Sequence, residues 1–141
     1  MTAPIHVLLI EDNPADALLT RETLETSKLH LSVEVAPDGE FATDLLLKRA
    51  AEEPHKLPDL ILLDLNLPRV KGTEVLAEIR GHEKLRVIPV VVLTSSDAER
   101  DVARSYELGA NCYVVKPVGL EAFQTIVSAV QNFWFSVVKL P

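Results

Sequence analysis

Three carboxylates, one hydroxyl and one ammonium group in this 141-residue sequence lie at the ends of short apolar runs. Glu11 and Asp12 follow "VLLI", Asp64 follows "LILL", Thr94 ends "VVVLT" and Lys116 follows "CYVV". If they converge, three carboxylates repel one another, which raises their pKa values unless a cation neutralises them. A small cluster of hard oxygen ligands favours Mg²⁺, which proteins hold through one or two carboxylates plus water and phosphate oxygens.

A Mg²⁺ site flanked by a lysine and a threonine is typical of phosphoryl transfer, in which positioning and charge neutralisation supply most of the catalysis. A carboxylate can itself be the nucleophile, and it then becomes an aspartyl phosphate. Polar residues at strand ends are also common because those ends meet solvent. The hypothesis of a phosphoryl-transfer site therefore depends on the combination of residue types and not on any single position.

The elements that would position these residues follow from the hydrophobic pattern. Short apolar runs alternate with longer segments whose apolar residues recur at spacings of three and four, which predicts a single parallel α/β sheet, (βα)5. The predicted strands are 5–10, 31–36, 60–63, 87–93 and 112–115, and the predicted helices are 14–27, 40–51, 72–80, 97–108 and one from residue 120 onward. Because "LSVEVA" alternates while the other runs are nearly unbroken, residues 31–36 are expected to form an edge strand.

Local signals support several of these boundaries. Pro14 suits a first helical turn, Gly81 and Gly109 suit helix ends, and the segment "AAEEPHKLPD" is typical of a loop. Ser96 or Asp97 is expected to cap the helix that follows. In such a sheet ligands bind at the carboxyl ends of the strands, where the strand order reverses. The polar residues of the first paragraph are therefore expected in one crevice.

Composition argues against several functions. With 48% hydrophobic and 25% charged residues, the chain is expected to fold as one domain with a sizeable core. A net charge of −7 without a block of lysines and arginines argues against nucleic acid and a membrane surface as partners. The N-terminal segment lacks a basic region, and its apolar run is too short for a signal peptide or a membrane span, so a cytoplasmic location is expected. Cys112 is expected to be a small buried thiol.

The chain resembles a response regulator receiver domain over essentially its whole length. The resemblance is carried by the "ED" pair at Glu11, by "LLDLNLP" around Asp64, by "LTSS" beginning at Leu93, and by "YVVKP" ending at Pro117. It implies a CheY-like, flavodoxin-like fold with strand order 2-1-3-4-5 and an extended C-terminal helix. The segments "EDNPADALLTRETL" and "FWFSVVKLP" further resemble stand-alone receivers that are partnered with phytochrome-type sensor kinases.

The resemblance implies a role for each matching residue. Asp64 is the expected phosphoacceptor from a phosphohistidine of a sensor histidine kinase. Asp12 is expected to bind Mg²⁺ directly and Glu11 mainly through water, while Asn66 supplies a backbone carbonyl. Thr94 is expected to bond a phosphoryl oxygen. Lys116 is expected to pair with the carboxylate or phosphoryl charge.

Switching is also implied by the resemblance. Tyr113 matches the family's switch aromatic, whose ring turns inward as Thr94 moves, and the bond between Lys116 and Pro117 is expected to be cis. Because Thr94 and Lys116 sit at strand ends, their removal is expected to leave the fold nearly as stable as before. Residues 1–141 are interpreted as one receiver domain, with the last helix and its extension at 119–141 and no effector domain. A downstream protein would then read its surface.

Two other functions stay open. A haloacid-dehalogenase-like phosphatase would turn over an external substrate. Such an enzyme has its nucleophile at the end of the first strand and a second aspartate two residues later. Here the residue two positions after Asp64 is Asn66. A binding module built on a receiver fold would need no phosphorylation, and the complete set of polar residues argues against it. A small phosphodonor separates the three, because it would label the chain, turn over continuously or do nothing.

The last helix offers more apolar residues than one sheet needs. Leu120, Phe123, Val127, Val130, Trp134 and Val137 form one stripe that is expected to cover the sheet. At about 100° per residue Phe135 projects away from that stripe, with Phe133 on the opposite shoulder and Val138 and Leu140 beyond the sheet edge. The aromatics could instead fold back on their own domain. The interpretation adopted is a homodimer through the last helix, with Phe133, Trp134, Phe135 and Val138 at the interface.

Overall fold

The computed structural model describes residues 4–26 and 30–141, and over this part of the chain five parallel strands form one sheet. The strands are β1 (Ile5–Ile10), β2 (Leu31–Ala36), β3 (Leu60–Leu63), β4 (Val90–Thr94) and β5 (Cys112–Val115). Their order is β2-β1-β3-β4-β5, which confirms the predicted order and the edge position of β2. Since the chain leaves β1 toward β2 and returns to β3 on the other side, the strand order reverses beside β1.

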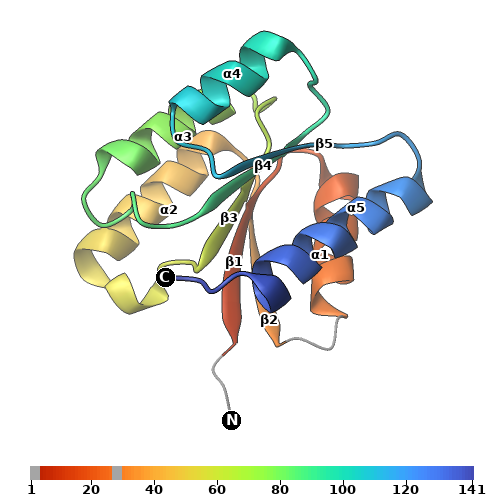
Figure 1. Ribbon diagram of the computed structural model, residues 1–141. Coiled ribbons are helices and arrows are strands. Elements are labelled where there is room, and N and C mark those ends of the chain that lie inside the picture. Colours follow the sequence, from red (N-terminus) through yellow and green to blue (C-terminus); the bar gives the residue numbers. More distant parts are fainter. Residues whose placement is uncertain (1–3, 27–29) are drawn as a thin grey trace.

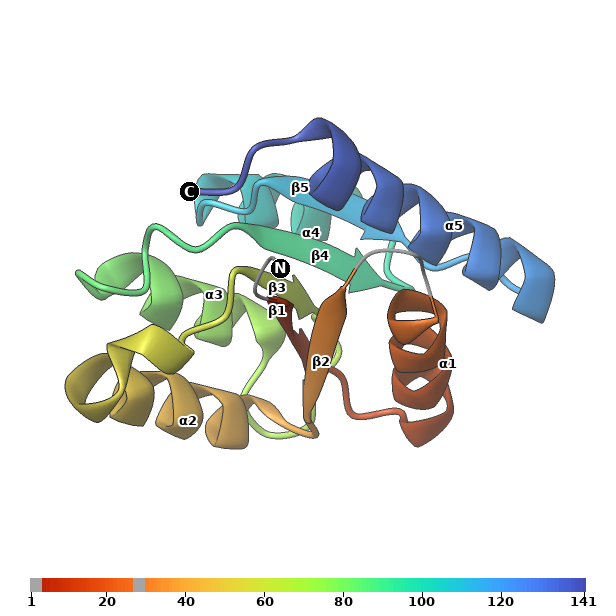
Figure 2. The ribbon, with the colours of Figure 1, turned by 90° about the horizontal axis from the view of Figure 1, so that it is seen from below.

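Helices cover both faces of the sheet. They are α1 (Pro14–Glu25), α2 (Gly39–Glu52), α3 (Gly72–Gly81), α4 (Glu99–Glu107) and α5 (Leu120–Asn132), with a 3₁₀ turn at Pro54–Lys56 and a π-helical turn at Phe133–Val137. Figures 1 and 2 show α1 and α5 side by side on one face, with α2 and α3 on the other. The sheet is thus buried on both sides, as its nearly continuous apolar strands require.

The alternation of side chains along each strand divides the interior into two cores. Leu8 and Ile10 of β1 pack with the buried residues of α2 and α3, whereas Val7 and Leu9 pack with those of α1 and α5. Both cores consist mainly of aliphatic side chains that are almost inaccessible to solvent, and the second also contains Phe123 and Trp134. The strand ends are therefore held rigidly from two sides, which fixes the positions of the residues that follow them.

Two predicted boundaries are wrong for local reasons. Strand β4 begins at Val90 and not at residue 87, because Pro89 has no N–H for the ladder and contributes only its carbonyl, which accepts from Ile61 N at 3.0 Å. Helix α4 begins at Glu99, so the N-cap residue is Ala98 and not Ser96 or Asp97, and the alanine side chain has no acceptor for a cap. The predicted loop at 50–59 contains the end of α2 and the 3₁₀ turn.

Helix α1 was expected to reach Ser27, but it ends at Glu25, and Ser27 itself lies outside the described residues. The other predicted strands, including β5, have the predicted bounds, and α2, α3 and α5 begin within one residue of the prediction. The elements that carry the strand-end polar residues are therefore those that the hydrophobic pattern predicted.

The loop between β3 and α3 is held close to the sheet by a glycine. A Cβ atom at Gly72 would lie 2.5 Å from the carbonyl oxygen of Asp64 and 2.6 Å from the Cα of Leu65, well inside van der Waals contact. The Gly72 N–H donates to the carbonyl of Leu65 at 3.1 Å. The start of α3 can therefore approach the backbone of Asp64 only because residue 72 lacks a side chain.

The C-terminal segment differs in part from its predicted role. Phe123, Val127, Val130 and Trp134 are buried against the sheet as expected, but Leu120 is 63% exposed. Phe135, Val138 and Leu140 are partly buried against the core of their own domain. The side chain of Val137 lies outside the described residues.

Burial argues against a place at the interface for two of the predicted residues. Trp134 is 8% exposed, so its ring is not available to a partner, and Phe135 packs mainly inward. Phe133 is 51% exposed and stays on the surface. Within the described residues, no helix combines the length and apolar character that crossing a membrane requires.

Candidate functional site

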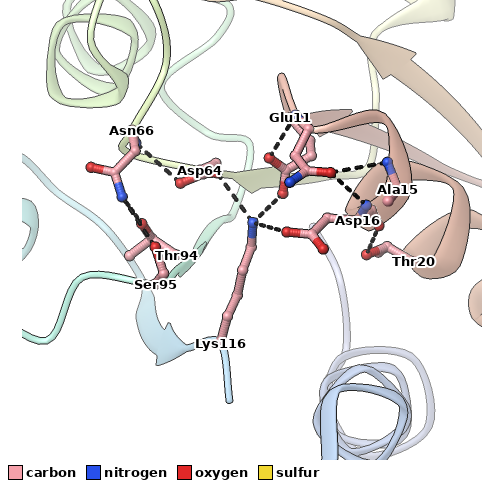
Figure 3. A network of polar contacts seen from close by, with 10 residues as sticks. Glu11, Ala15, Asp16, Thr20, Asp64, Asn66, Thr94, Ser95 and Lys116 are labelled. Atoms are coloured by element: carbon pink, nitrogen blue, oxygen red, sulfur yellow. Dashed lines mark hydrogen bonds and ion pairs between the residues drawn. The ribbon is translucent and has the colours of Figure 1, made fainter. Parts of the chain in front are cut away.

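The polar residues at the strand ends converge as predicted. Carboxylate oxygens of Glu11, Asp12 and Asp64 all lie within 4.8 Å of one another. Lys116 reaches Glu11 and Asp64 from the end of β5, and Thr94 lies at the end of β4 beside them (Figure 3). Four separate segments of the chain thus meet in one crevice at the carboxyl edge of the sheet.

Backbone hydrogen bonds beyond the strands fix where these side chains start. The N–H of Glu11 donates to the carbonyl of Ala36 at 3.0 Å, and the N–H of Asp64 donates to the carbonyl of Ile10 at 3.0 Å. The N–H of Lys116 donates to the carbonyl of Thr94 at 2.7 Å. Each of the three residues therefore extends the hydrogen-bonded ladder by one position, and the rigid sheet sets their spacing.

The acidic cluster has the ligand set of a divalent cation site. Glu11 and Asp64 are buried, whereas Asp12 is exposed at the mouth of the crevice. All their donor atoms are hard carboxylate oxygens, which suit Mg²⁺ or a similar cation better than softer metals. A cation in the crevice would lie beside the two buried carboxylates, Glu11 and Asp64, and it could keep several waters on the side that is open to solvent.

Lys116 partly neutralises the crevice. Its side chain is 8% exposed, and its Nζ donates to Asp64 Oδ2 at 3.1 Å, to Asp16 Oδ2 at 3.0 Å and to Glu11 Oε1. Burial acts to lower the pKa of Lys116, but its hydrogen bond to Glu11 and the charges of Asp64 and Glu11 raise the pKa above its ordinary value. The lysine is therefore charged at any physiological pH.

Glu11 and Asp64 respond in opposite directions to their shared environment. Burial, followed by its hydrogen bond with Asp64, raises the pKa of Glu11 to about 8. Burial also acts to raise the pKa of Asp64, but hydrogen bonds from Glu11 and from the N–H of Asn66, with the charge of Lys116, bring that pKa below its ordinary value. Without a metal and below a pH of about 8, Glu11 therefore carries a proton while Asp64 is the ionised carboxylate of the pair.

This asymmetry predicts a pH dependence of stability for the metal-free protein. Glu11 keeps its proton in the folded state up to a pKa of about 8, while the unfolded chain releases it near the ordinary glutamate pKa of 4.5. Between these values the folded state binds more protons, so the free energy of unfolding should fall as pH rises, by on the order of a few kcal/mol. Urea denaturation at pH 5.5 and 8.5 in EDTA measures the change.

A Glu11→Gln variant provides the control, because it lacks the titrating group and should lose less stability over this pH range. An equal loss in the wild type and in Glu11→Gln would show that another group is responsible.

Thr94 and Asn66 occupy the side of the crevice opposite Lys116. The Nδ2 of Asn66 donates to the hydroxyls of Thr94 and Ser95, each at 3.3 Å, and its backbone N–H donates to Asp64 Oδ1 at 3.0 Å. Metal binding by the backbone carbonyl of Asn66 stays a prediction. The side chain of Thr94 is fully buried and that of Lys116 nearly so. The expectation that both could be replaced with little loss of stability rested on exposed strand ends, and that premise does not hold.

Tyr113 is connected to the same region through the loop after β4. Its hydroxyl donates to the carbonyl of Ser96 at 2.8 Å, two residues beyond Thr94. Burial raises the pKa of Tyr113, so the phenol stays protonated and able to donate. The peptide bond between Lys116 and Pro117 is trans and not cis, which corrects the expectation and agrees with the general preference of X-Pro bonds.

One member of the network was not found from the sequence. Asp16 lies in the first turn of α1 and pairs with Lys116, which is 100 residues away along the chain. Its position three residues after Asn13, the N-cap of α1, places it in the first helical turn after β1. Nothing in the local pattern, however, indicates a partner that comes from β5.

Comparisons with known proteins agree with this geometry. The sequence model of the response regulator receiver domain matches residues 7–128. The response regulator Rcp1 of Synechocystis sp. is 44% identical over 138 residues, which cover 98% of this chain and 94% of Rcp1.

Two solved structures are similar over nearly their whole length. The phosphorylated cyanobacterial phytochrome response regulator RcpA superposes with a TM-score of 0.90 at 42% identity and covers 99% of both chains. The Mn²⁺-bound form of Rcp1 superposes with a TM-score of 0.88 at 44% identity and covers 98% of this chain and 99% of that one.

Proposed function

The chain belongs to the response regulator receiver family, and from this we propose that it accepts a phosphoryl group on Asp64 from a sensor histidine kinase of a two-component phosphorelay. The observation that carries the proposal is the ionised, buried Asp64 carboxylate, which pairs with Lys116 and has an oxygen within 4.8 Å of those of Glu11 and Asp12. As part of the same proposal, the chain acts in the cytoplasm as a stand-alone receiver. It has no external substrate, and its output is a changed protein surface.

In the proposed step an Asp64 oxygen attacks the phosphorus of a phosphohistidine. The O–P bond forms as the N–P bond breaks, the electron pair returns to the imidazole nitrogen, and that nitrogen takes up a proton. Lys116, 3.1 Å from Asp64, is placed to hold a phosphoryl oxygen, and the buried Thr94 hydroxyl is placed to donate to another. These contacts would stabilise the charge of the transferred group.

Mg²⁺ is the proposed cofactor, held by Asp12, Asp64 and the backbone carbonyl of Asn66, with Glu11 acting mainly through water. The three carboxylates support it, and so does the Mn²⁺ bound in the structure of Rcp1. When bound, a divalent cation neutralises the carboxylates and the incoming phosphoryl charge. The protein contributes the spacing of these ligands, which the hydrogen bonds of Glu11 and Asp64 to the neighbouring strands set.

The switch is proposed to pass from Thr94 to Tyr113. A hydroxyl that moves toward a phosphoryl group on Asp64 would pull on the backbone of residues 94–96, whose last carbonyl accepts the hydrogen bond of Tyr113. Release or rotation of the Tyr113 ring would then change the surface formed by α4 and β5. A downstream protein of unknown identity would bind one of the two forms.

A phytochrome-type kinase is the proposed donor, supported by the similarity to Rcp1 and to RcpA. Exposed apolar side chains on the segments that follow β1 and β5 offer a surface for such a donor, namely Leu18 on α1, Val118 after β5 and Leu120 at the start of α5. The test is incubation with radiolabelled, autophosphorylated phytochrome-type kinases. Transfer to the wild type and not to Asp64→Asn is expected. Loss of kinase label as free phosphate without a labelled intermediate would favour a phosphatase instead.

We further propose a homodimer through the end of α5. An apolar groove of about 230 Å³ runs between β5 and α5, and it is lined by Cys112, Val114, Ile126, Ala129, Val130, Phe133 and Trp134. Phe133 is 51% exposed at its end, so the same ring of a second copy could fill the groove. Exposed aromatic residues beside apolar grooves are typical of interfaces.

The dimer predicts the effect of one substitution. Phe133→Asp should shift the sedimentation coefficient at high protein concentration from dimer to monomer, and it should weaken association by about tenfold or more, because it places a charge in an apolar interface. Phe41→Asp is the matched control, since Phe41 is similarly exposed, at 49%, but lies on α2. A wild type that stays monomeric at all concentrations, with or without acetyl phosphate, would contradict the dimer.

A further inference from the structure

Lys116 uses its full hydrogen-bonding capacity in this structure. An ammonium group has three N–H donors, and Lys116 directs them at three carboxylates, those of Glu11, Asp16 and Asp64 (Figure 3). Because the side chain is 8% exposed, water has little access to the ammonium group. A new acceptor in the crevice can therefore bond to Lys116 only if one of these three carboxylates gives up its bond.

Asp16 differs from the other two carboxylates in where it lies. It does not belong to the cluster of oxygens within 4.8 Å that Glu11, Asp12 and Asp64 form, and its side chain is 33% exposed. Its partial exposure lets water replace a lost hydrogen bond, which the buried Glu11 and Asp64 do not allow. The bond between Lys116 and Asp16 is therefore the one that costs least to break.

The backbone of Asp16 is fixed, so the carboxylate does not simply follow the lysine. Asn13 caps α1 by accepting from the N–H groups of Ala15 at 3.0 Å and Asp16 at 3.1 Å. The Thr20 hydroxyl donates to the carbonyl of Asp16 at 2.7 Å. The first turn of α1 thus holds Asp16 in place, and its helix dipole favours the negative charge there.

We propose that Asp16 is a positioning residue that holds one donor of Lys116 while Asp64 is unmodified and releases it when a phosphoryl group arrives. The inference rests on the proposed function, because it requires a phosphoryl oxygen as the acceptor that displaces Asp16. The Asp16 charge then acts on the two states of the crevice in opposite directions.

In the unmodified protein Asp16 offsets part of the Lys116 charge, and this reduces the repulsion between Lys116 and a second cation beside Glu11 and Asp64. Its removal leaves that charge to oppose Mg²⁺. In the phosphorylated protein the same removal frees a donor of Lys116 without a competing partner. The phosphoryl group is then bound more tightly.

The test compares Asp16→Asn with the wild type by isothermal titration, with Mg²⁺ alone and then with beryllium fluoride, a phosphoryl analogue, at saturating Mg²⁺. Asp16→Asn should bind Mg²⁺ about threefold or more weakly and beryllium fluoride about threefold or more tightly. The affinities of Asp16→Glu, which keeps the charge, should lie between those of the wild type and those of Asp16→Asn. Asp44→Asn removes an equal charge from an exposed position on α2 and should change neither affinity.

The opposite signs separate positioning from damage to the fold. If both affinities fall, or if neither changes, Asp16 does not divide Lys116 between two partners, and the inference is wrong. Asp16→Ala repeats the measurement with a good helix former, so a poorly folded Asp16→Asn does not decide the outcome. A wild type that binds neither probe would contradict the proposed function as well. If the wild type binds both probes and the Asp16 variants bind them with the same affinities, only this inference is contradicted.

Discussion

Lys116→Met is expected to lower the free energy of unfolding of the metal-free protein by about 3 kcal/mol at pH 8. The variant keeps most of the buried chain volume but removes the ammonium group that pairs with Glu11, Asp16 and Asp64. Two of these carboxylates are buried, so the loss leaves uncompensated negative charge in a poorly solvated site. Urea denaturation in EDTA measures the change.

The cost should shrink under two conditions that remove the same charge. At pH 5.5 Glu11 already carries a proton and Asp64 can take one up once the lysine is gone, and added Mg²⁺ can replace part of the lysine's charge. Lys48→Met is the matched control, because Lys48 is exposed on α2, and its replacement should change stability by less than about 0.5 kcal/mol. Equal stability of the two variants at pH 8 would show that Lys116 does not neutralise the crevice.

Removal of Mg²⁺ is expected to slow the labelling of the protein by acetyl phosphate by on the order of 100-fold. Glu11 and Asp12 lie beside the Asp64 acceptor, Asp16 shares Lys116 with it, and Lys116 is the cation beside them. An incoming phosphoryl group therefore meets net negative charge unless a divalent cation is present. Labelling rates with Mg²⁺ and with EDTA, followed by mass spectrometry, measure the effect.

Asp12→Asn makes this prediction specific to the cluster. Asp12 is exposed, so the variant should fold like the wild type but need at least about tenfold more Mg²⁺ for half-maximal labelling. Asp44→Asn serves again as the charge-matched control and should need no more Mg²⁺ than the wild type. If EDTA left the wild-type rate unchanged, the carboxylate cluster would not be a cation site in this reaction.

The sequence was sufficient to predict the sheet and most of the crevice, because both depend on local pattern. The run "LILL" is apolar at every position and ends at Asp64, so its burial and its end could be predicted together. The same reasoning failed at β4, where Val87 and Ile88 are apolar but precede the strand. There the ladder begins only after Pro89, and the N–H of Val90 donates at 2.8 Å to Asn111, 21 residues away.

Features that depend on distant contacts or on irregular helix geometry were not predictable in this way. Asp16 is part of the site only because Lys116 reaches it from β5. The position of Phe135 was predicted for a regular α-helix, but the chain makes a π-helical turn at Phe133–Val137, where the N–H of Val138 donates to the carbonyl of Phe133 at 2.9 Å. That turn changes the angle per residue, and Phe135 packs partly against its own domain.

Intact-protein mass spectrometry after incubation with acetyl phosphate and Mg²⁺ tests whether Asp64 is the phosphoacceptor. The wild type should gain the mass of one phosphoryl group, and Asp64→Asn, measured in parallel, should gain none. The gain should disappear on treatment with hydroxylamine, which cleaves acyl phosphates. Equal labelling of the wild type and Asp64→Asn, or an unlabelled wild type that is folded and supplied with Mg²⁺, would contradict the account.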